Sequence, residues 1–241
     1  MKTDFHSHIL PNMDDGARSV EESLEMLSRM KADGVDTVVS TSHFYRHNEN
    51  IETFLKRRTS CYERLMEAAE GLDIPRIVLG AEVYFTTALV HDANLAKLCI
   101  GDTDYLLLEM PYSSFSHTLI NSYADFVNMC GKKIIIAHVE RYLKFTDRES
   151  VNEILSFDVL GQVNCNSFMT MGGRKQLKPF IEANLLHLIG SDCHNLTTRP
   201  PNFSKCEAAV KRKFGKDLFE TMMRNADRVL DNAELEDVLF S

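Results

Sequence analysis

The sequence lacks the segments that would place it in or across a membrane. No apolar run approaches the length of about 20 residues that a transmembrane helix needs. No apolar stretch follows the opening Met1-Lys2-Thr3-Asp4, so no signal peptide is visible. Internal repeats, low-complexity tracts and linkers are missing as well. We therefore expect no membrane insertion and a single domain over residues 1–241.

Cysteine pairs at the spacing of metal or redox sites are also missing. The six cysteines, at positions 61, 99, 130, 165, 193 and 206, include no Cys-x-x-Cys pair. In a chain of this length, the pattern fits free thiols in a reducing compartment better than a disulfide framework. We therefore expect a cytoplasmic protein.

Positive charge is scarcer than negative charge. The chain has 27 Lys and Arg against 35 Asp and Glu, a formal net charge of −8. A nucleic-acid-binding surface needs a stripe of basic residues, so this balance argues against a nucleic-acid partner. It does not exclude one phosphorylated group held locally by metals and arginines.

What the sequence does contain is an alternation of apolar strands and helices. Strands are predicted at residues 4–8, 36–42, 76–84, 104–110, 133–138, 159–164 and 186–192. Helices are predicted from a Ser19/Glu22 capping box to Gly34, over 51–71, 119–129 and 172–184, and in short pieces over 203–240. Strands so rich in Val, Ile and Leu indicate a parallel sheet buried on both faces. Seven such units favour a closed, irregular β/α barrel, with an open doubly wound sheet as the alternative.

The first strand carries a histidine pair. His6 and His8 are two residues apart, so both imidazoles project from the same face of a strand. Asp14 and Asp15 follow in a loop bounded by Pro11 and Gly16. Imidazoles with a carboxylate suit Zn²⁺, Mn²⁺ or Fe²⁺. Taken alone, the pair is more typical of ordinary surface histidines near the N-terminus.

The other predicted strands decide between these interpretations, because nearly all of them end in a metal-type side chain. With the N-terminal residues, the candidates are His6, His8, Asp15, His43, Glu82, Glu109, His138, Asp192 and His194. Active sites of β/α barrels lie at this end of the strands. Nine such groups exceed the needs of one tetrahedral ion, so we expect two or three cations bridged by carboxylates.

Two arginines extend the candidate site. Arg141 follows His138 by three residues, and Arg199 follows His194 by five. Guanidinium groups bind phosphate oxygens in a bidentate manner. Paired cations would clamp a phosphoryl group and acidify a bridging water. The alternative for either arginine alone is a solvated surface position.

Five segments together resemble a known superfamily. They are Asp-Phe-His-Ser-His-Ile-Leu-Pro with a later Asp-Asp-Gly, Ser-Thr-Ser-His, Gly-Ala-Glu-Val-Tyr, Ala-His-Val-Glu-Arg-Tyr, and Gly-Ser-Asp-Cys-His-Asn-Leu-x-x-Arg-Pro-Pro. In this order, from residue 4 to about 204, they resemble the polymerase and histidinol phosphatase (PHP) superfamily. Within it they resemble the bacterial protein-tyrosine phosphatases of the CpsB/YwqE type.

This resemblance implies a distorted (β/α)₇ barrel with three cations, Mn²⁺ by preference and Fe²⁺, Zn²⁺ or Mg²⁺ as alternatives. It implies hydrolysis of phosphotyrosine on a bacterial tyrosine kinase that controls capsule or exopolysaccharide export. We expect direct attack by a metal-bridging hydroxide, because no serine or cysteine in the sequence has both a neighbouring base and a phosphate cradle. The resemblance assigns His6, His8, Glu82 and Asp192 to a first metal. Glu82 bridges to a second, completed by Glu109 and His138, and Asp15, His43 and His194 hold a third. Arg141 and Arg199 match phosphate-contacting arginines.

The loop after His43 matches no family pattern, and we expect Tyr45 and Arg46 there to line the substrate mouth. We expect His47, His91 and His117 to be exposed and His187 to pack in the core. We also expect a monomer.

One alternative mechanism and two alternative functions remain. Cys193 and Arg199 have the Cys-x₅-Arg spacing of thiol-dependent tyrosine phosphatases. The loop between them has no glycine, however, and the adjacent Asp192 would raise the thiol pKa. The others are a small-molecule phosphoesterase, such as histidinol-phosphate phosphatase, and a non-catalytic PHP-like module.

Overall fold

A computed structural model describes residues 1–90 and 92–239, so the prediction for His91 falls outside the described residues. Within them, the strands are β1 Thr3–Ser7, β2 Thr37–Ser40, β3 His43–Phe44, β4 Arg76–Leu79, β5 Glu82–Tyr84, β6 Tyr105–Glu109, β7 Lys133–Ile136, β8 Val159–Asn164 and β9 Leu188–Gly190. They pair in parallel in two sheets, in the orders β1-β2-β4 and β3-β5-β6-β7-β8-β9. The predicted parallel sheet is therefore confirmed.

Two of the predicted strands differ from those in the structure. The segment expected at 36–42 ends at Ser40 as β2, and β3 begins beyond it at His43, while the segment expected at 76–84 divides into β4 and β5. Ser40 still pairs with Leu79, and after the break His43 pairs with Glu82. At the break the backbone of Thr41 turns to bond Ser7, its N–H donating to the Ser7 carbonyl at 2.8 Å. The chain therefore passes from the first sheet, with β2 and β4, to the second sheet, with β3 and β5, at His43 and Glu82.

The curled sheet closes between its first and last strands. The N–H of Asp192 donates to the carbonyl of His6 at 2.7 Å, and the N–H of His8 donates to that of Cys193 at 2.9 Å. Gly190 permits this approach, because a Cβ on it would lie 2.4 Å from the Cβ of His6. The result is the distorted β/α barrel that the sequence predicts, and not an open doubly wound sheet.

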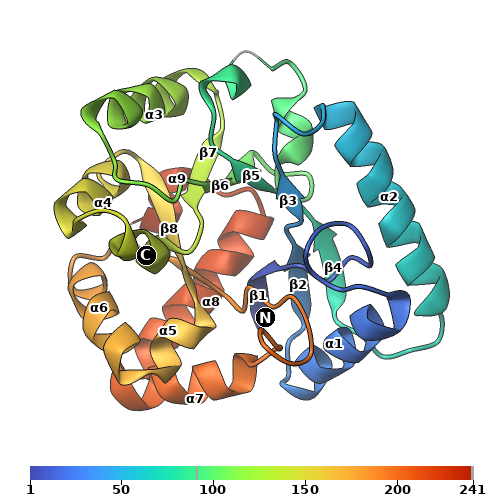
Figure 1. The fold of residues 1–241 in the computed structure, drawn as a ribbon. Coiled ribbons are helices and arrows are strands. Elements are labelled where there is room, and N and C mark those ends of the chain that lie inside the picture. The colour runs from blue at the N-terminus through green and yellow to red at the C-terminus, as the bar shows by residue number, and fades with distance from the viewer. Residues whose placement is uncertain (91, 240–241) are drawn as a thin grey trace.

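Most of the helices surround the strands in Figure 1, whereas α8 (Lys216–Leu230) crosses the middle of the view. Their bounds are α1 Val20–Ala32, α2 Ile51–Ala68, α3 His117–Met129, α4 Arg148–Leu155, α5 Cys165–Met169, α6 Met171–Glu182, α7 Phe203–Lys213, α8 Lys216–Leu230 and α9 Leu235–Leu239, with 3₁₀ turns η1 Thr87–Leu89, η2 Leu95–Leu98 and η3 Val139–Lys144. Ser19 caps α1 and accepts a hydrogen bond from the N–H of Glu22, as the capping box predicts. Helices α4 and α5 were not predicted.

The barrel interior is filled by side chains from alternate positions of the strands. Tyr105 and Leu107 of β6 pack with Leu160 of β8 in one buried cluster, which includes Ala226 and Val229 of α8. Residues two apart on a strand share a face. Glu109 and Gln162 therefore follow Leu107 and Leu160 on the inner face, toward the carboxyl end of the barrel. Because Leu107 and Leu160 are buried inside the barrel, Glu109 and Gln162 also point inward, at the carboxyl end of the strands.

Candidate metal centre

The nine predicted metal-type residues converge at the carboxyl end of the barrel. The nitrogen and oxygen atoms of eight of them, all but His138, form three groups, each with all ligand atoms within 4.8 Å of one another. The groups are His8, Asp15, His43 and His194; His6, His8 and Asp192; and His43, Glu82 and Glu109. His8 and His43 belong to two groups each, so the groups overlap as one cluster. The resemblance also places Asp15, His43 and His194 together, and His6, His8 and Asp192 together. It groups Glu82 and Glu109 with His138, however, where the structure has His43.

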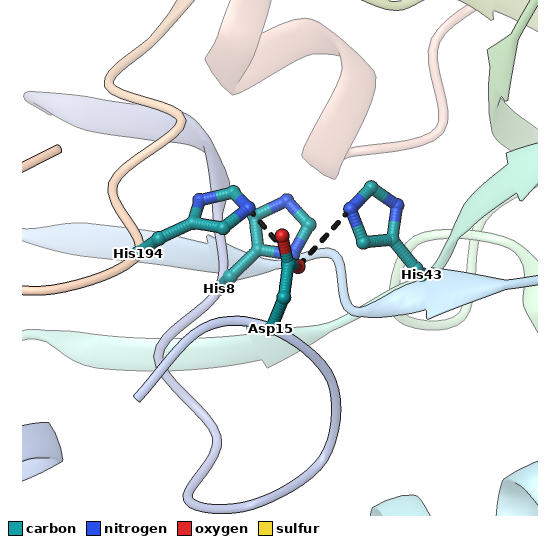
Figure 2. A group of neighbouring side chains, drawn as sticks. All are labelled: His8, Asp15, His43 and His194. Carbon is teal, nitrogen blue, oxygen red and sulfur yellow. Dashed lines mark ion pairs between the residues drawn. The ribbon is translucent and has the colours of Figure 1, made fainter. Parts of the chain in front are cut away.

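The first group is centred on Asp15 (Figure 2). Its Oδ1 lies 3.4 Å from Nε2 of His43 and 3.3 Å from Nε2 of His194. The imidazole of His8 lies between these rings, with its centroid 4.5 Å from that of His43 and 3.9 Å from that of His194. Segments far apart in the sequence therefore present two imidazoles to a single carboxylate, with the imidazole of His8 between them.

Glu82 lies at the centre of the whole cluster. Its carboxylate oxygens are within 3.3 Å of ring nitrogens of His6, His8, His43 and His138. Burial raises the pKa of the Glu82 carboxyl, but the surrounding histidines overcome this effect and hold it well below its usual value. Nε2 of His138, 2.6 Å from Glu82, also lies 3.5 Å from Oε1 of Glu109. His138 is thereby joined to the third group.

The cluster meets the requirements of divalent cations. Glu82, Glu109 and Asp192 are at most 2% exposed, and burying several carboxylates together is unfavourable without compensating positive charge. Oε2 of Glu109 is buried and has no hydrogen-bond partner among the described residues. Nitrogen and oxygen donors in this mixture suit Mn²⁺, Fe²⁺ or Zn²⁺. The residues therefore fit a metal centre.

Hydrogen bonds fix the tautomers of two of the imidazoles. Oδ2 of Asp14 accepts the backbone N–H of His43 at 2.9 Å and lies 2.8 Å from Nδ1 of His8. Nδ1 of His194 lies 3.0 Å from the carbonyl oxygen of Asp192, which can only accept. Both Nδ1 atoms must therefore carry the proton, which leaves Nε2 of His8 and His194 free to donate an electron pair to a metal. Gly16 allows the loop to pack here, because a Cβ on it would lie 2.2 Å from the carbonyl oxygen of His8.

A pair of amides on β8 connects three other strands. Oε1 of Gln162 accepts the backbone N–H of His138 at 2.7 Å and lies 3.0 Å from Nδ1 of His6. Nε2 of Gln162 donates to Oδ1 of Asn164 at 3.1 Å, and Nδ2 of Asn164 donates to Oδ2 of Asp192 at 2.7 Å. We call this series of hydrogen bonds through Gln162 and Asn164 the β8 amide relay. It ties side chains or backbone from β1, the end of β7 and the loop after β9 together.

Two of the converging residues have backbone conformations that non-glycine residues rarely adopt. The φ angle is 29° at His138 and 53° at Asp192. Positive φ is unfavourable for residues with a Cβ, and it persists only where neighbouring contacts impose it. At His138 the contact is with Gln162, and at Asp192 it is the bond to the carbonyl of His6. Such conformations concentrate at functional sites.

Both predicted arginines contact the same carboxylate. Nη2 of Arg199 lies 2.6 Å from Oδ1 of Asp192, and Nη2 of Arg141 donates to Oδ2 of Asp192. Each arginine is still partly exposed, at 28% for Arg141 and 30% for Arg199. They therefore lie between the buried cluster and solvent, where an anionic ligand would enter.

Two cavities flank the cluster. The larger, of about 560 Å³, is lined by Met13, Asp14, Asp15, His43, Tyr45, Asn48, Glu49 and Arg57. The smaller, of about 350 Å³, is lined by Tyr112, Arg141, Lys144, Phe145 and Arg199. Tyr45 thus lies at the mouth, with its ring centroid 5.4 Å from that of His43. Arg46 instead forms an ion pair with Asp92 at 3.3 Å and is not among the lining residues.

The remaining candidates behave as packing or surface residues. Cys193 is fully buried, and burial together with nearby Asp4 raises the pKa of its thiol. His187 is 3% exposed, which confirms the prediction that it packs in the core. His47 and His117 are exposed, also as predicted.

Sequence reasoning missed Gln162, Asn164 and Tyr112, and it gave Asp14 no separate role. Gln162 and Asn164 did carry a signal, since they are polar residues at alternate positions of an otherwise apolar strand. Tyr112 lies three residues beyond Glu109 in the loop after β6, and its hydroxyl is 3.3 Å from Nε2 of His138. No sequence pattern indicates that contact.

The chain is similar to proteins of known function. Residues 2–231 match the family model described as "Capsular polysaccharide synthesis, CpsB/CapC". Tyrosine-protein phosphatase CpsB of Streptococcus agalactiae serotype III (strain NEM316) is 30% identical over 241 residues, covering 95% of this chain and 98% of that protein. Tyrosine-protein phosphatase YwqE of Bacillus subtilis (strain 168) is 32% identical over 245 residues, covering 95% and 91%.

Solved structures are similar as well. One is described under YwqE from Bacillus subtilis and CpsB from Streptococcus pneumoniae, "unique metal-dependent tyrosine phosphatases". It matches with a TM-score of 0.79 and 27% identity over 96% of this chain and 95% of that one. Histidinol phosphate phosphatase from Lactococcus lactis matches with a TM-score of 0.52 and 14% identity over 88% and 93%. The latter supports the fold alone.

Proposed function

Because this chain belongs to the CpsB/CapC family of capsular polysaccharide synthesis proteins, we propose that it is a metal-dependent tyrosine-protein phosphatase. The observation that carries the proposal is the cluster around Glu82, where buried carboxylates and imidazoles converge beside two arginines. Imidazole and carboxylate donors support metal binding, and the arginines support a phosphorylated substrate.

The cluster has enough donors for three divalent cations, for which Mn²⁺ is our proposed native ion. His6, His8 and Asp192 would contribute to one site, and Asp15, His43 and His194 to another. Glu82, with Glu109 and His138, would contribute to the third. Bound cations would polarise the phosphoryl oxygens and lower the pKa of a water toward neutrality.

The residues of the chain itself would bind and orient the phosphoryl group. Arg141 and Arg199 are held on opposite oxygens of Asp192, which directs both guanidinium groups to one side of the cluster. There they can donate to phosphate oxygens and stabilise the charge that develops during transfer. Asp192 thus serves as the positioning residue of the two arginines.

The thiol of Cys193 is not placed to act as a nucleophile. Cys193 is fully buried, and the raised pKa of its thiol opposes thiolate formation. Its neighbour Asp192 adds negative charge, which is the opposite of what a reactive thiolate needs. We therefore propose that water attacks phosphorus directly and that no phosphoenzyme forms.

We further propose the cellular setting. The substrate would be a phosphotyrosine protein, specifically a bacterial tyrosine kinase that regulates capsule or exopolysaccharide synthesis. The enzyme would act as a single domain over residues 1–241 in the cytoplasm, where six unpaired thiols are compatible with a reducing environment. Among the described helices, none is both long and apolar enough to span a bilayer.

A substrate panel tests the proposal. The purified protein, supplied with Mn²⁺, is assayed for phosphate release from a phosphotyrosine peptide and from histidinol phosphate. We expect kcat/KM to be higher for the peptide by at least about tenfold. A preference for histidinol phosphate would instead indicate a small-molecule phosphoesterase, and no turnover of either substrate would indicate a non-catalytic module.

A further inference from the structure

The smaller cavity beside the metal centre has a composition that the phosphate chemistry alone does not require. It has a volume of about 350 Å³ and is lined by Tyr112, Arg141, Lys144, Phe145 and Arg199. The arginines account for a phosphoryl group. The two aromatic rings belong to none of the groups of metal-type side chains, and the lysine adds a third cation to the arginine pair, so these three residues need a separate explanation.

The two rings form an exposed aromatic surface. Among the described residues, Tyr112 and Phe145 are the aromatic members of the exposed large hydrophobic side chains, at 39% and 44%. Their centroids are 5.3 Å apart, within the range of favourable aromatic contacts. An adjacent pair of exposed rings at a cavity is a natural contact surface for another aromatic ring.

This aromatic surface is joined directly to the metal cluster. The hydroxyl of Tyr112 lies 3.3 Å from Nε2 of His138, and Nη1 of Arg141 donates to the same hydroxyl at 3.3 Å. The ring of Tyr112 also stacks on that of His138, with the centroids 5.9 Å apart. A phosphoryl group at the arginines would therefore place its attached ring against Tyr112 and Phe145.

Lys144 supplies a charge that is not neutralised within the described part of the chain. Three cations and no carboxylate line the cavity, although the chain as a whole has a formal net charge of −8. Arg141 and Arg199 are both paired with Asp192. Lys144 is exposed and forms no ion pair with any residue in the described ranges 1–90 and 92–239. Its charge is therefore available to a ligand.

We propose that this cavity is the specificity site for the substrate peptide, with Tyr112 and Phe145 contacting the phosphotyrosine ring and Lys144 selecting an acidic residue beside the phosphotyrosine. The proposal rests on the tyrosine phosphatase function proposed above and adds the class of sequence that this enzyme prefers. A surface ion pair contributes modestly, so the preference for an acidic neighbour is on the order of threefold.

Two phosphotyrosine peptides that differ only in Glu or Gln beside the phosphotyrosine test the role of Lys144. The wild-type protein is expected to give a kcat/KM ratio of about three in favour of Glu, Lys144→Ala a ratio near one, and Lys144→Glu a preference for Gln. Lys216→Ala is the matched control, because Lys216 is an exposed lysine on α8 outside the cavity. It should keep the wild-type ratio.

A binding measurement separates selection from turnover. Fluorescein-labelled versions of both peptides, with a non-hydrolysable phosphonate in place of the phosphate, are titrated with each protein and followed by anisotropy. The ratio of the two dissociation constants should change with Lys144 as the kcat/KM ratio does. Equal ratios in wild type and Lys144→Ala, in a protein that hydrolyses both peptides, would overturn this proposal and leave the phosphatase function standing. Absence of any hydrolysis would instead overturn the phosphatase function.

The aromatic contact has its own test. Phe145→Ala should weaken binding of the phosphonate peptides by about threefold to tenfold, the usual range for one aromatic contact. Met171→Ala removes an apolar side chain that is 82% exposed and lies outside the cavity, so it should bind like wild type. Equal affinity of Phe145→Ala and wild type would exclude Phe145 from the ring site.

Discussion

Oε1 of Gln162 lies 3.0 Å from Nδ1 of His6, and the same oxygen accepts the backbone N–H of His138. A backbone N–H can only donate, so this atom of Gln162 must be the carbonyl oxygen and His6 must be protonated on Nδ1. Nε2 of His6 is then free to face Glu82 and His8. One backbone donor thereby sets the tautomer of a proposed metal ligand.

Replacing Gln162 with Leu should therefore weaken metal binding without removing a ligand. His6 would lose its acceptor, and losses of this kind reduce metal affinity by about tenfold to a hundredfold. Isothermal titration of the metal-free protein with Mn²⁺ measures the effect. Gln176→Leu, at an exposed position of α6, is the control. Unchanged affinity in Gln162→Leu would show that the β8 amide relay does not position the ligands.

Arg199→Ala should lower kcat by on the order of 10²-fold, because one donor to the developing charge is lost. The metal content, measured by elemental analysis, should stay at the wild-type value. Arg148→Ala, at an exposed position of α4, should retain wild-type kcat. A fall in metal content of Arg199→Ala would assign Arg199 a structural role through its pairing with Asp192.

The thiol and metal mechanisms give opposite results for two substitutions. Cys193→Ser should retain most of the aryl phosphatase activity, since the thiol is buried and the pKa of Cys193 is raised. His138→Ala should abolish it, because the imidazole lies between Glu82 and Glu109. Loss of activity in Cys193→Ser with activity kept in His138→Ala would support the thiol.

Much of the fold could be predicted because the strand signals are local. The run from Val159 to Asn164 is predicted with the bounds that β8 has in the structure. The breaks after Ser40 and Leu79 could not be predicted from the local sequence. They depend on how β2 pairs with β1 on one side and with β4 on the other. Helix α5 has five residues and little periodicity of its own, so it too gave no signal.

The convergence of the candidate residues could be predicted from the order of the strands, whereas the hydrogen bonds and ion pairs between their side chains could not. Placing His43 and Glu82 at strand ends was enough to expect them at the same end of a barrel. That Gln162 would bond both His6 and His138 depends on side-chain geometry across three strands. Arg46 shows the same dependence, because its pairing with Asp92 could not be inferred from a loop without a recognisable pattern.

Acid should destabilise the protein in part through His187. Burial lowers the pKa of His187 to about 4, against about 6.5 in an unfolded chain. Between these values the unfolded state binds more protons, so this contribution is complete above about pH 6.5 and is lost as the pH falls toward 4. The full loss is about 3 kcal/mol.

Urea unfolding of chelator-treated protein at pH 7 and pH 4 measures that contribution. His187→Gln keeps an acceptor for the N–H of Gly161, which bonds Nδ1 of His187 at 3.0 Å. It should lose about 3 kcal/mol less between the two pH values than wild type. His117→Gln, at an exposed position, should behave like wild type. Equal losses in His187→Gln and wild type would exclude His187 as an acid-sensitive group.

Removal and return of metal test most directly the claim that the phosphatase activity depends on bound divalent cations. The protein is stripped with a chelator, dialysed, and assayed on a phosphotyrosine peptide while Mn²⁺ is added back and bound metal is counted. Activity should vanish on stripping and return as occupancy rises toward three ions per chain. Full activity in protein shown by elemental analysis to be free of metal would contradict the claim.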